Sequence, residues 1–332
     1  MNYLIEMKLE SKMTGMSKPK EDIIEILTKV GYRDLKYVRR SNKYLRLFLT
    51  YFDLKQEVRK IGKNSKDKLI IQYPLYSKIS TLYLFNILKN RDVQIVGFVH
   101  DIEALRMNKN DKKKVKDELE LLRKFDVLIV HNQYMKKWLI DQGITCKFIE
   151  LNIFDYLNDK PMVNTSIDKP IVYAGNLGKS PFFKELKINK NISLFGVNEE
   201  KNYPQNVTYC GAKKPDELPL YLDGSFGLVW DGNRVDTNSG IYGEYTRYNN
   251  PHKVSLYLSS GLPVIVWKQA AMAQFVESNK IGIVIDSLQD IDNVLSNISS
   301  DDYLAMVDNV HKISNKLREG YYTKHAVNSI DE

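Results

Sequence analysis

The sequence predicts an α/β protein made of two doubly wound halves that face each other across a cleft. Short apolar runs rich in β-branched residues recur along the chain and alternate with helical patterns, as in parallel sheets with crossover helices. A polar stretch over residues 152–169 interrupts this alternation, and a second alternation follows it. The 332 residues are enough for two such domains of roughly 150 residues each.

The first half, residues 1–152, reads as about six βα units. We expect strands at 3–7, 67–73, 94–99, 127–130 and 147–150, with the chain returning along 32–38. The expected helices are 21–30, 43–61, 80–89, 112–124 and 133–141. Right-handed crossovers between such units build one doubly wound sheet.

The second half, residues 170–310, repeats this pattern. Its strands are expected at 170–174, 192–196, 207–211, 226–230, 263–267 and 281–285. Its helices are expected at 182–186, 216–222, 251–260, 270–277, 290–297 and 300–320, and the tract 234–247 reads as a mobile loop. We expect the tail, residues 311–332, to pack back on the first half or to form a contact in a homo-oligomer.

The stretch 248–267 is the most informative of the chain. Asn250 is placed to cap a helix, Pro251 suits its first turn, and Gly261 ends it. The apolar run 262–267 then predicts a buried parallel strand. A helix that starts in this way exposes several backbone N–H groups at its positive end.

Four polar side chains gather at this predicted helix start: Asn249, Asn250, His252 and Lys253. Exposed N–H groups and a cation converging on one spot favour an anion there, and a diphosphate fits this arrangement. The alternative is an ordinary helix that happens to begin with Asn-Pro and a nearby lysine.

Three further strand ends carry candidate binding residues. The loop 175–179 has two glycines that allow close backbone approach, and it contributes Asn176, Leu177 and Lys179, although a plain strand-to-helix turn would look the same. Tyr209 and Gly211 end another strand, where backbone groups can pair with a flat base edge. Asp231 follows a third strand.

In the first half, the strand 94–99 delivers His100 and Asp101 at its carboxyl end, where open parallel sheets bind ligands. Either side chain is a candidate general base. The alternative is that the two residues bond to each other or to the backbone and only shape the loop.

Composition excludes several other classes of protein. The chain has no run of 18 apolar residues and no nucleic-acid-binding motif, and residues 1–7 do not show the charged and apolar pattern that is typical of a secretory leader. Cys146 and Cys210 lack C-x-x-C spacing, so we expect a reducing, cytoplasmic location without disulfides or zinc. The largest concentration of the net charge of +8 is at 109–116. This run indicates a solvated helix face, an attraction to anionic lipid at the inner face of the membrane, or an attraction to an anionic acceptor.

The motifs 98–106, 173–177, 209–211 and above all 249–267 resemble those of bacterial sugar-nucleotide glycosyltransferases with two Rossmann-like domains, the GT-B architecture. Within this family, the chain resembles the glucosyltransferases that extend glycans on serine-rich-repeat adhesins and the β-1,6-galactofuranosyltransferases of polysaccharide synthesis. The resemblance implies a UDP-sugar held by the second half, a glycan acceptor held by the first half, and catalysis without a metal or other cofactor.

Several site residues are assigned through the resemblance. Lys253 and the helix start at Asn250 match the diphosphate-binding positions, Lys179 matches a basic loop residue, and Tyr209 with Gly211 matches the base-binding edge. In the adhesin enzymes the N-terminal loop is Asn-rich. Here residues 13–16 take its place, so Thr14 and Gly15 are expected to contact donor or acceptor, and the departure favours the galactofuranosyl relatives.

The acidic residues bear on the type of transfer. No Glu-x7-Glu pair follows residue 169, which favours an inverting reaction over a retaining one. The single D-x-D, Asp290 with Asp292, reads as a helix start rather than as a metal clamp. The donor sugar stays open between galactofuranose, glucose and N-acetylglucosamine, and the acceptor between a lipid-linked glycan and a glycoprotein. A non-catalytic sugar-nucleotide-binding subunit is the alternative function.

Overall fold

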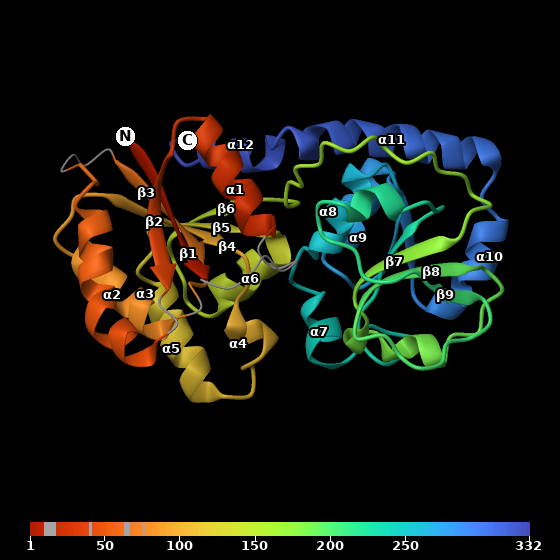
Figure 1. The fold of residues 1–332 in the computed structure, drawn as a ribbon, viewed down its shortest axis with the longest axis horizontal. Helices are drawn as coiled ribbons and strands as arrows, with labels where there is room; N and C mark the ends of the chain where they lie inside the picture. Colours follow the sequence, from red (N-terminus) through yellow and green to blue (C-terminus); the bar gives the residue numbers. More distant parts are fainter. Residues whose placement is uncertain (10–17, 40–41, 63–66, 76) are drawn as a thin grey trace. The chain divides into compact units, whose positions relative to one another are not determined.

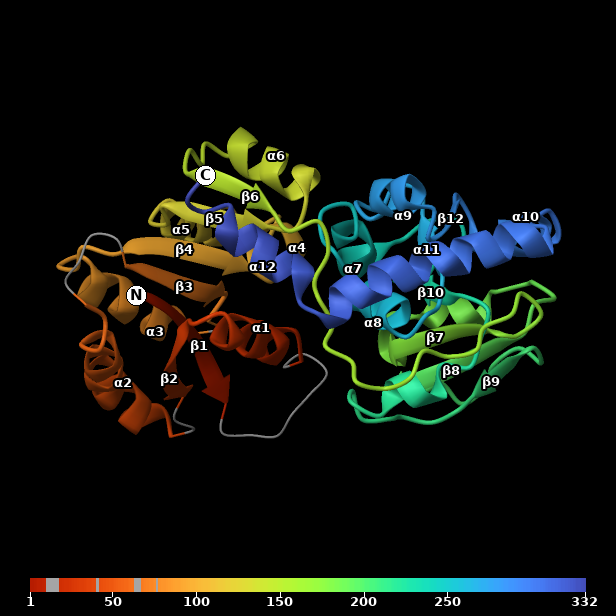
Figure 2. The same cartoon turned by 90° about the horizontal axis from the view of Figure 1, so that it is seen from above.

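The computed structural model describes residues 1–9, 18–39, 42–62, 67–75 and 77–332 (Figures 1 and 2). The chain forms two compact units. The first contains Met1–Leu151 together with Thr323–Glu332, and the second contains Asn152–Tyr322. The polar stretch 152–169 and residues 311–322 therefore belong to the second unit.

The first unit is built on a six-stranded parallel sheet. Its strands are β1 (Asn2–Leu9), β2 (Arg33–Arg39), β3 (Lys68–Tyr73), β4 (Gln94–Val99), β5 (Val127–Val130) and β6 (Lys147–Glu150). Their order is β2-β1-β3-β4-β5-β6, so the strand order reverses between β1 and β3. Open α/β sheets bind ligands outside the carboxyl ends of the strands at such a reversal.

Helices cover both faces of this sheet. They are α1 (Lys18–Lys29), α2 (Lys43–Val58), α3 (Lys78–Leu88), α4 (Glu103–Arg106), α5 (Lys112–Leu122), α6 (Gln133–Asp141) and most of α12 (Tyr321–Asn328). In Figure 1, α2, α3 and α5 lie on one face and α1 and α12 on the other. The connection from β1 to β2 crosses the sheet in one direction, and the connections from β2 to β3, β4 and β5 cross it in the opposite direction. Because each crossover is right-handed, α1 lies on the opposite face from α2, α3 and α5.

The second unit repeats the plan with another six parallel strands. They are β7 (Ile171–Asn176), β8 (Ile192–Val197), β9 (Val207–Tyr209), β10 (Gly227–Val229), β11 (Val264–Trp267) and β12 (Gly282–Ile285). Their order is β12-β11-β10-β7-β8-β9, and the reversal lies between β7 and β10. The predicted fold class of two Rossmann-like units is confirmed.

The helices of the second unit follow the sequence pattern less closely. They are α7 (Gly240–Tyr245), α8 (His252–Ser259), α9 (Ala273–Asn279), α10 (Ile291–Ser296) and α11 (Ser300–Arg318). The helices expected at 182–186 and 216–222 are single 3₁₀ turns, η2 (Pro181–Lys184) and η3 (Leu218–Tyr221), each with a proline in its first turn. The shorter segments η1 (Leu177–Lys179) and η4 (Leu288–Asp290) complete this unit. The tract expected to be a mobile loop contains α7.

The stretch 152–169 is packed along α8. The carbonyl of Phe154 accepts a hydrogen bond from Ser255 Oγ at 2.6 Å, and Val163 N donates to the carbonyl of Ser260 at 2.9 Å. Thr165 Oγ1 donates to the carbonyl of Gly224 at 2.6 Å. These bonds explain why this aperiodic segment belongs to the second unit.

Candidate functional site

Helix α8 begins beside the strand reversal of the second sheet. The N-cap residue is Pro251, which provides no side-chain cap, and the helix ends before Gly261, whose φ of +93° suits glycine. The first-turn N–H groups therefore lack the usual capping side chain. A helix start of this kind can bind an anion when a cation lies beside it.

The prediction that Asn250 caps α8 is wrong. Asn250 is only 3% exposed, and its Nδ2 donates to the carbonyl of Asn152 at 2.9 Å. A proline disfavours the helical conformation in the residue before it, and Pro251 itself takes the extended N-cap conformation with ψ at 132°. Asn250 thus lies one residue outside the helix and fastens the stretch 152–169 to it.

Lys253, in the first turn of α8, points into the protein. Its Nζ lies 3.0 Å from Asp231 Oδ1 and donates to Tyr173 Oη at 3.1 Å, and it is 4.4 Å from the centroid of the Tyr173 ring. Burial alone would lower the pKa of Lys253, but the Asp231 carboxylate beside it raises the pKa above its ordinary value. Lys253 therefore stays protonated, and the Asp231 carboxylate is its counterion.

Tyr173 and Ser180 complete this cluster, and sequence reasoning missed both. The Tyr173 hydroxyl bonds to Ser180 Oγ and lies 3.4 Å from Asp231 Oδ1. Burial raises the pKa of Tyr173, so the ring stays a neutral phenol. The sequence signal was the position of Tyr173 inside β7, which carries its side chain into the core beside the strand reversal.

Tyr257 occupies the seam where β7 and β10 separate. The two strands pair only at Val172 and Gly227, and a Cβ on Gly227 would lie 2.1 Å from the Tyr257 ring. The Tyr257 hydroxyl accepts from Ala174 N at 2.7 Å and donates to the carbonyl of Leu228 at 3.3 Å. The Tyr257 hydroxyl therefore bonds to backbone groups of β7 and β10 beyond the point where these two strands stop pairing with each other.

The loops after β7 and β10 are tied together at this edge. Gly232 N donates to the carbonyl of Lys179 at 2.9 Å, and Lys179 Nζ lies 3.9 Å from the centroid of the Tyr242 ring. Asn176 Oδ1 accepts from Gly178 N at 3.0 Å and from Asn198 Nδ2 at 2.8 Å. The side chain of Leu177 is part of the core, so only its backbone can face a ligand.

Tyr209 and Gly211 lie at the outer edge of the sheet. Tyr209 is 37% exposed and donates from its hydroxyl to the carbonyl of Gly196 at 2.9 Å, while Gly196 N donates to the carbonyl of Gly211 at 3.3 Å. A Cβ on Gly196 would lie 1.7 Å from the carbonyl oxygen of Gly175. Gly196, which sequence reasoning missed, thus lets the ends of β7 and β8 approach closely.

The other two polar residues at the start of α8 lie in different environments. His252 contacts the stretch 152–169, with its ring centroid 5.2 Å from that of Phe154 and 5.9 Å from that of Tyr156. Asn249 N donates to the carbonyl of Tyr245 at 3.1 Å. Its buried Oδ1 has no hydrogen-bond partner within the part of the chain that the structure describes.

In the first unit, His100 and Asp101 both have partners near the end of β4. His100 Nε2 lies 2.8 Å from Gln72 Oε1, and Asp101 Oδ2 accepts from Arg106 Nη1 at 2.8 Å. Another carboxylate, that of Glu118, lies nearby and accepts a hydrogen bond from Tyr73 Oη at 2.7 Å. Burial raises the pKa of Glu118. Sequence reasoning missed Glu118 because it sits within a run of charged helix residues.

The strand reversal of the first unit also holds a buried ion pair. Lys20 Nζ lies 2.8 Å from Glu6 Oε1 and donates to the carbonyl of Pro74 at 3.1 Å. An acidic residue inside the apolar strand β1 was the available sequence signal. Thr14 and Gly15, the predicted contacts in the preceding loop, lie outside the described residues.

The D-x-D acids have structural partners. Asp290 Oδ2 accepts from Ser287 N at 3.1 Å in a capping box, and Asp292 accepts from Asn189 N at 2.6 Å and from Lys190 N at 3.1 Å. Within the described ranges, no group of three or more His, Cys, Asp or Glu side chains could hold a metal ion, and no helix is long and apolar enough to cross a membrane. Cys146 and Cys210, the two cysteines of the sequence, form no disulfide bond with each other.

Comparison with known proteins identifies relatives over nearly the whole chain. The family model for the N-terminal domain of glucosyltransferase 3-like proteins matches residues 1–153, and the model for the C-terminal domain matches residues 171–330. The β-1,6-galactofuranosyltransferase WbbI of Escherichia coli strain K12 is 33% identical over 81% of this chain and 80% of its own. Glucosyltransferase 3 of Streptococcus gordonii is 30% identical over 71% of this chain and 70% of its own.

Solved structures share the fold at much lower identity. Sucrose-phosphate synthase from Thermosynechococcus elongatus matches with a TM-score of 0.66 and 12% identity, covering 99% of this chain and 97% of that one. An α,α-trehalose-phosphate synthase (UDP-forming) from Burkholderia xenovorans matches with a TM-score of 0.64 and 9% identity over 100% of both chains. These matches correspond to the GT-B architecture.

Proposed function

Because the chain belongs to the glucosyltransferase 3-like family and is a glycosyltransferase, we propose that it transfers a hexosyl group from a UDP-sugar to a glycan acceptor. The observation that carries this proposal is the start of α8, where a helix terminus without a side-chain cap and the partly buried Lys253 lie at the strand reversal of the second sheet. A nucleoside diphosphate is the leaving group that such an arrangement would stabilise.

The proposed donor site follows the carboxyl edge of the second sheet. The diphosphate is assigned to the first-turn N–H groups of α8, to Lys253 and to Lys179, with Asn176 and Asn249 as further polar contacts. The base is assigned to the edge near Tyr209 and Gly211, where an exposed aromatic ring lies beside the close approach of β7 and β8 that Gly196 allows. His252 and Asn250 support this site by holding the stretch 152–169 against α8.

Asp231 has a definite part in this proposal. An ammonium group buried without a counterion is costly, and the Asp231 carboxylate removes that cost before the donor binds. When a diphosphate approaches, the protonated Lys253 is already in place, so little reorganisation is needed as negative charge develops on the leaving group. Tyr173 holds the Lys253 ammonium from a second side.

We propose Asp101 as the group that accepts the proton of the acceptor hydroxyl, with His100 as the alternative. Both follow β4 at the carboxyl edge of the first sheet, where ligands of such sheets bind. Asp101 is held by Arg106 and His100 by Gln72, so each side chain has a defined position.

The finer features of the reaction are also proposals. Inversion is supported by the absence of a Glu-x7-Glu pair after residue 169. Metal independence is supported by the backbone hydrogen bonds that occupy Asp290 and Asp292. The names of the relatives support galactofuranose or glucose as the donor sugar, and N-acetylglucosamine stays open. We further propose a cytoplasmic homo-oligomer acting on a glycan carried by a lipid or a glycoprotein.

A donor panel tests the proposal directly. Thermal unfolding would be followed with UDP-glucose, UDP-galactofuranose, UDP-N-acetylglucosamine and UDP, and a donor at a hundredfold excess over its Kd would stabilise the protein by about 2.7 kcal/mol. The best donor would then be tested for transfer by wild type, Asp101→Asn and His100→Gln, with the product anomer assigned by NMR and with EDTA as the metal control. Binding of UDP without turnover of any UDP-hexose would instead identify a non-catalytic sugar-nucleotide-binding subunit.

A further inference from the structure

Helices α2 and α3 of the first unit present a surface with two kinds of side chain. We define the α2–α3 surface by its exposed apolar residues and by the basic residues that line the adjoining hollow. The apolar residues are Tyr44, Leu45, Phe52, Ile79 and Leu82, and the basic ones are Lys55, Arg59, Lys89 and Arg91. No residue of this surface belongs to the donor site proposed above.

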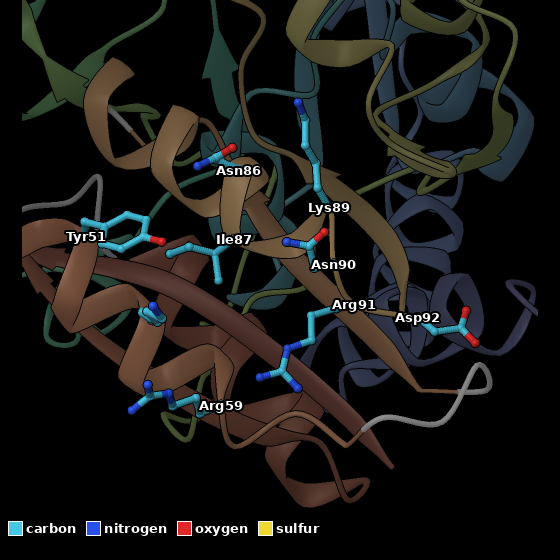
Figure 3. A pocket seen from close by; sticks show the side chains of 9 residues that line it. Tyr51, Arg59, Asn86, Ile87, Lys89, Asn90, Arg91 and Asp92 are labelled. Carbon is cyan, nitrogen blue, oxygen red and sulfur yellow. The ribbon is translucent and has the colours of Figure 1, made fainter.

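The hollow lies between the C-terminal halves of the two helices and has a volume of about 560 Å³. Figure 3 shows Tyr51 directed toward Ile87, with Arg59 and Arg91 further along and Lys89 extending in the opposite direction to Arg91. The Tyr51 ring also packs edge-on against Tyr83, with 5.6 Å between centroids, which holds α2 and α3 together. The hollow therefore has a rigid aromatic wall and a basic rim.

The positive charge of this hollow is not neutralised. Four cations line it, against the single carboxylate of Asp92. Lys55 lies 5.5 Å from the centroid of the Tyr51 ring, and none of the four cations forms an ion pair with another described residue. A hollow with this charge favours an anionic ligand.

The apolar residues continue the same helix faces. On α2, Phe52 precedes Lys55 and Arg59 by three and seven residues, and on α3, Leu82 precedes Asn86 and Lys89 by four and seven. Each helix thus changes along one face from apolar to polar or basic side chains. Phe52 is 64% exposed and Leu82 is 46% exposed, so these side chains do not serve the core.

Two ordinary explanations account for only part of this surface. Cations at helix C-termini are expected from the helix dipole alone, but the dipole does not explain the exposed aromatic and aliphatic residues beside them. An interface between two copies would bury the apolar residues, but it would also bring two basic hollows of a chain with net charge +8 toward each other. A surface that is apolar on one side and basic on the other suits the interface of an anionic bilayer.

We propose that the α2–α3 surface docks on an anionic membrane surface. The Arg59 and Arg91 side chains bind lipid phosphates in the hollow, while Phe52 and Leu82 enter the headgroup region. This surface shares no residue with the basic run 109–116, which is the membrane contact that the sequence alone suggests. It also does not depend on which sugar the enzyme transfers.

Vesicle flotation of the full chain tests the proposal. Vesicles of phosphatidylglycerol mixed with phosphatidylcholine would bind the wild type, and vesicles of phosphatidylcholine alone would bind it weakly. Arg59→Gln with Arg91→Gln should lower the partition coefficient roughly thirtyfold, since each cation near an anionic surface contributes about fivefold. Phe52→Ser with Leu82→Ser should also lower it, and because both residues are exposed, folding should be retained.

Lys112→Gln with Lys113→Gln is the matched control, because it removes the same charge from exposed positions of the run 109–116. It should leave most of the binding intact. Equal losses in the control and the Arg59/Arg91 variant would overturn the proposal, as would equal binding to both kinds of vesicle. Release of the protein by millimolar glycerol phosphate would identify a site for a soluble anion instead. Light scattering that shows a dimer lost in the Phe52/Leu82 variant, without vesicle binding, would identify an interface between copies.

Discussion

Both sheets hold a lysine–carboxylate pair where the strand order reverses, buried in the first unit and partly buried in the second, but the two pairs are built differently. In the first unit, Glu6 lies within β1, and Lys20 of α1 bridges it to the carbonyl of Pro74 just after β3. In the second unit, Asp231 follows the end of β10, and Lys253 lies in the first turn of α8. Each lysine comes shortly after a proline at a helix start, Pro19 and Pro251.

The position of the acid relative to its strand end decides what each pair can do. The carboxylate of Glu6 is held by the sheet, so Lys20 fastens two neighbouring strands. Asp231 belongs to a loop at the carboxyl edge, so the Lys253 ammonium lies beside a helix start that has no side-chain cap, at the edge where open α/β sheets bind ligands. A buried lysine–acid pair at a strand reversal is therefore not by itself the mark of a ligand site.

The largest effect is expected from breaking the pair of the first unit. Lys20→Met leaves the Glu6 carboxylate buried without its cation, which should lower the free energy of unfolding of this unit by about 3–5 kcal/mol. Hydrogen exchange followed by mass spectrometry would report the two units separately. The double variant with Glu6→Leu should recover much of the loss, and an unchanged exchange pattern in Lys20→Met would contradict the fastening role.

Breaking the second pair should affect transfer more than stability. Lys253→Ala removes the cation proposed to stabilise the leaving group, so kcat/KM for transfer should fall by about 10²–10³, or about 2.7–4 kcal/mol of transition-state stabilisation. The control is the double variant Lys253→Ala with Asp231→Asn, because the second substitution removes the Asp231 carboxylate that Lys253→Ala leaves without its cation. Activity restored by the second substitution would show that the loss came from misplaced charge rather than from the missing cation.

The smallest effect is expected at the seam of the second sheet. Tyr257→Phe leaves the Ala174 N–H without its partner and should cost about 1–3 kcal/mol of unfolding free energy, while the ring still fills the space beside Gly227. Urea unfolding followed by the fluorescence of the buried Trp230 and Trp267 would measure it. Tyr303→Phe, which removes another buried hydroxyl bond in the same unit, is the matched control for activity. Tyr257→Phe should raise KM for the donor more than this control does.

Much of the fold could be predicted from local patterns. The apolar runs at 127–130 and 264–267 are buried strands, and Gly261 ends α8. The family resemblance drawn from 249–267 and the other motifs is confirmed. The capping rule that places Asn250 at the helix start considers only neighbours in sequence, but the partner of Asn250 in the structure is Asn152, 98 residues away. The composition of the tract 234–247 predicts a loop, although α7 forms within it.

By itself, then, the sequence determined the order of strands and helices, the two-unit plan and the family, because hydrophobic period, proline and glycine act over a few residues. The tertiary structure decided that Lys253 meets Asp231 and Tyr173, that Lys20 meets Glu6, and that basic and apolar side chains gather on α2 and α3. These contacts depend on which strands become neighbours and on how helices pack over them. Hydrophobic periodicity carries no information on either point.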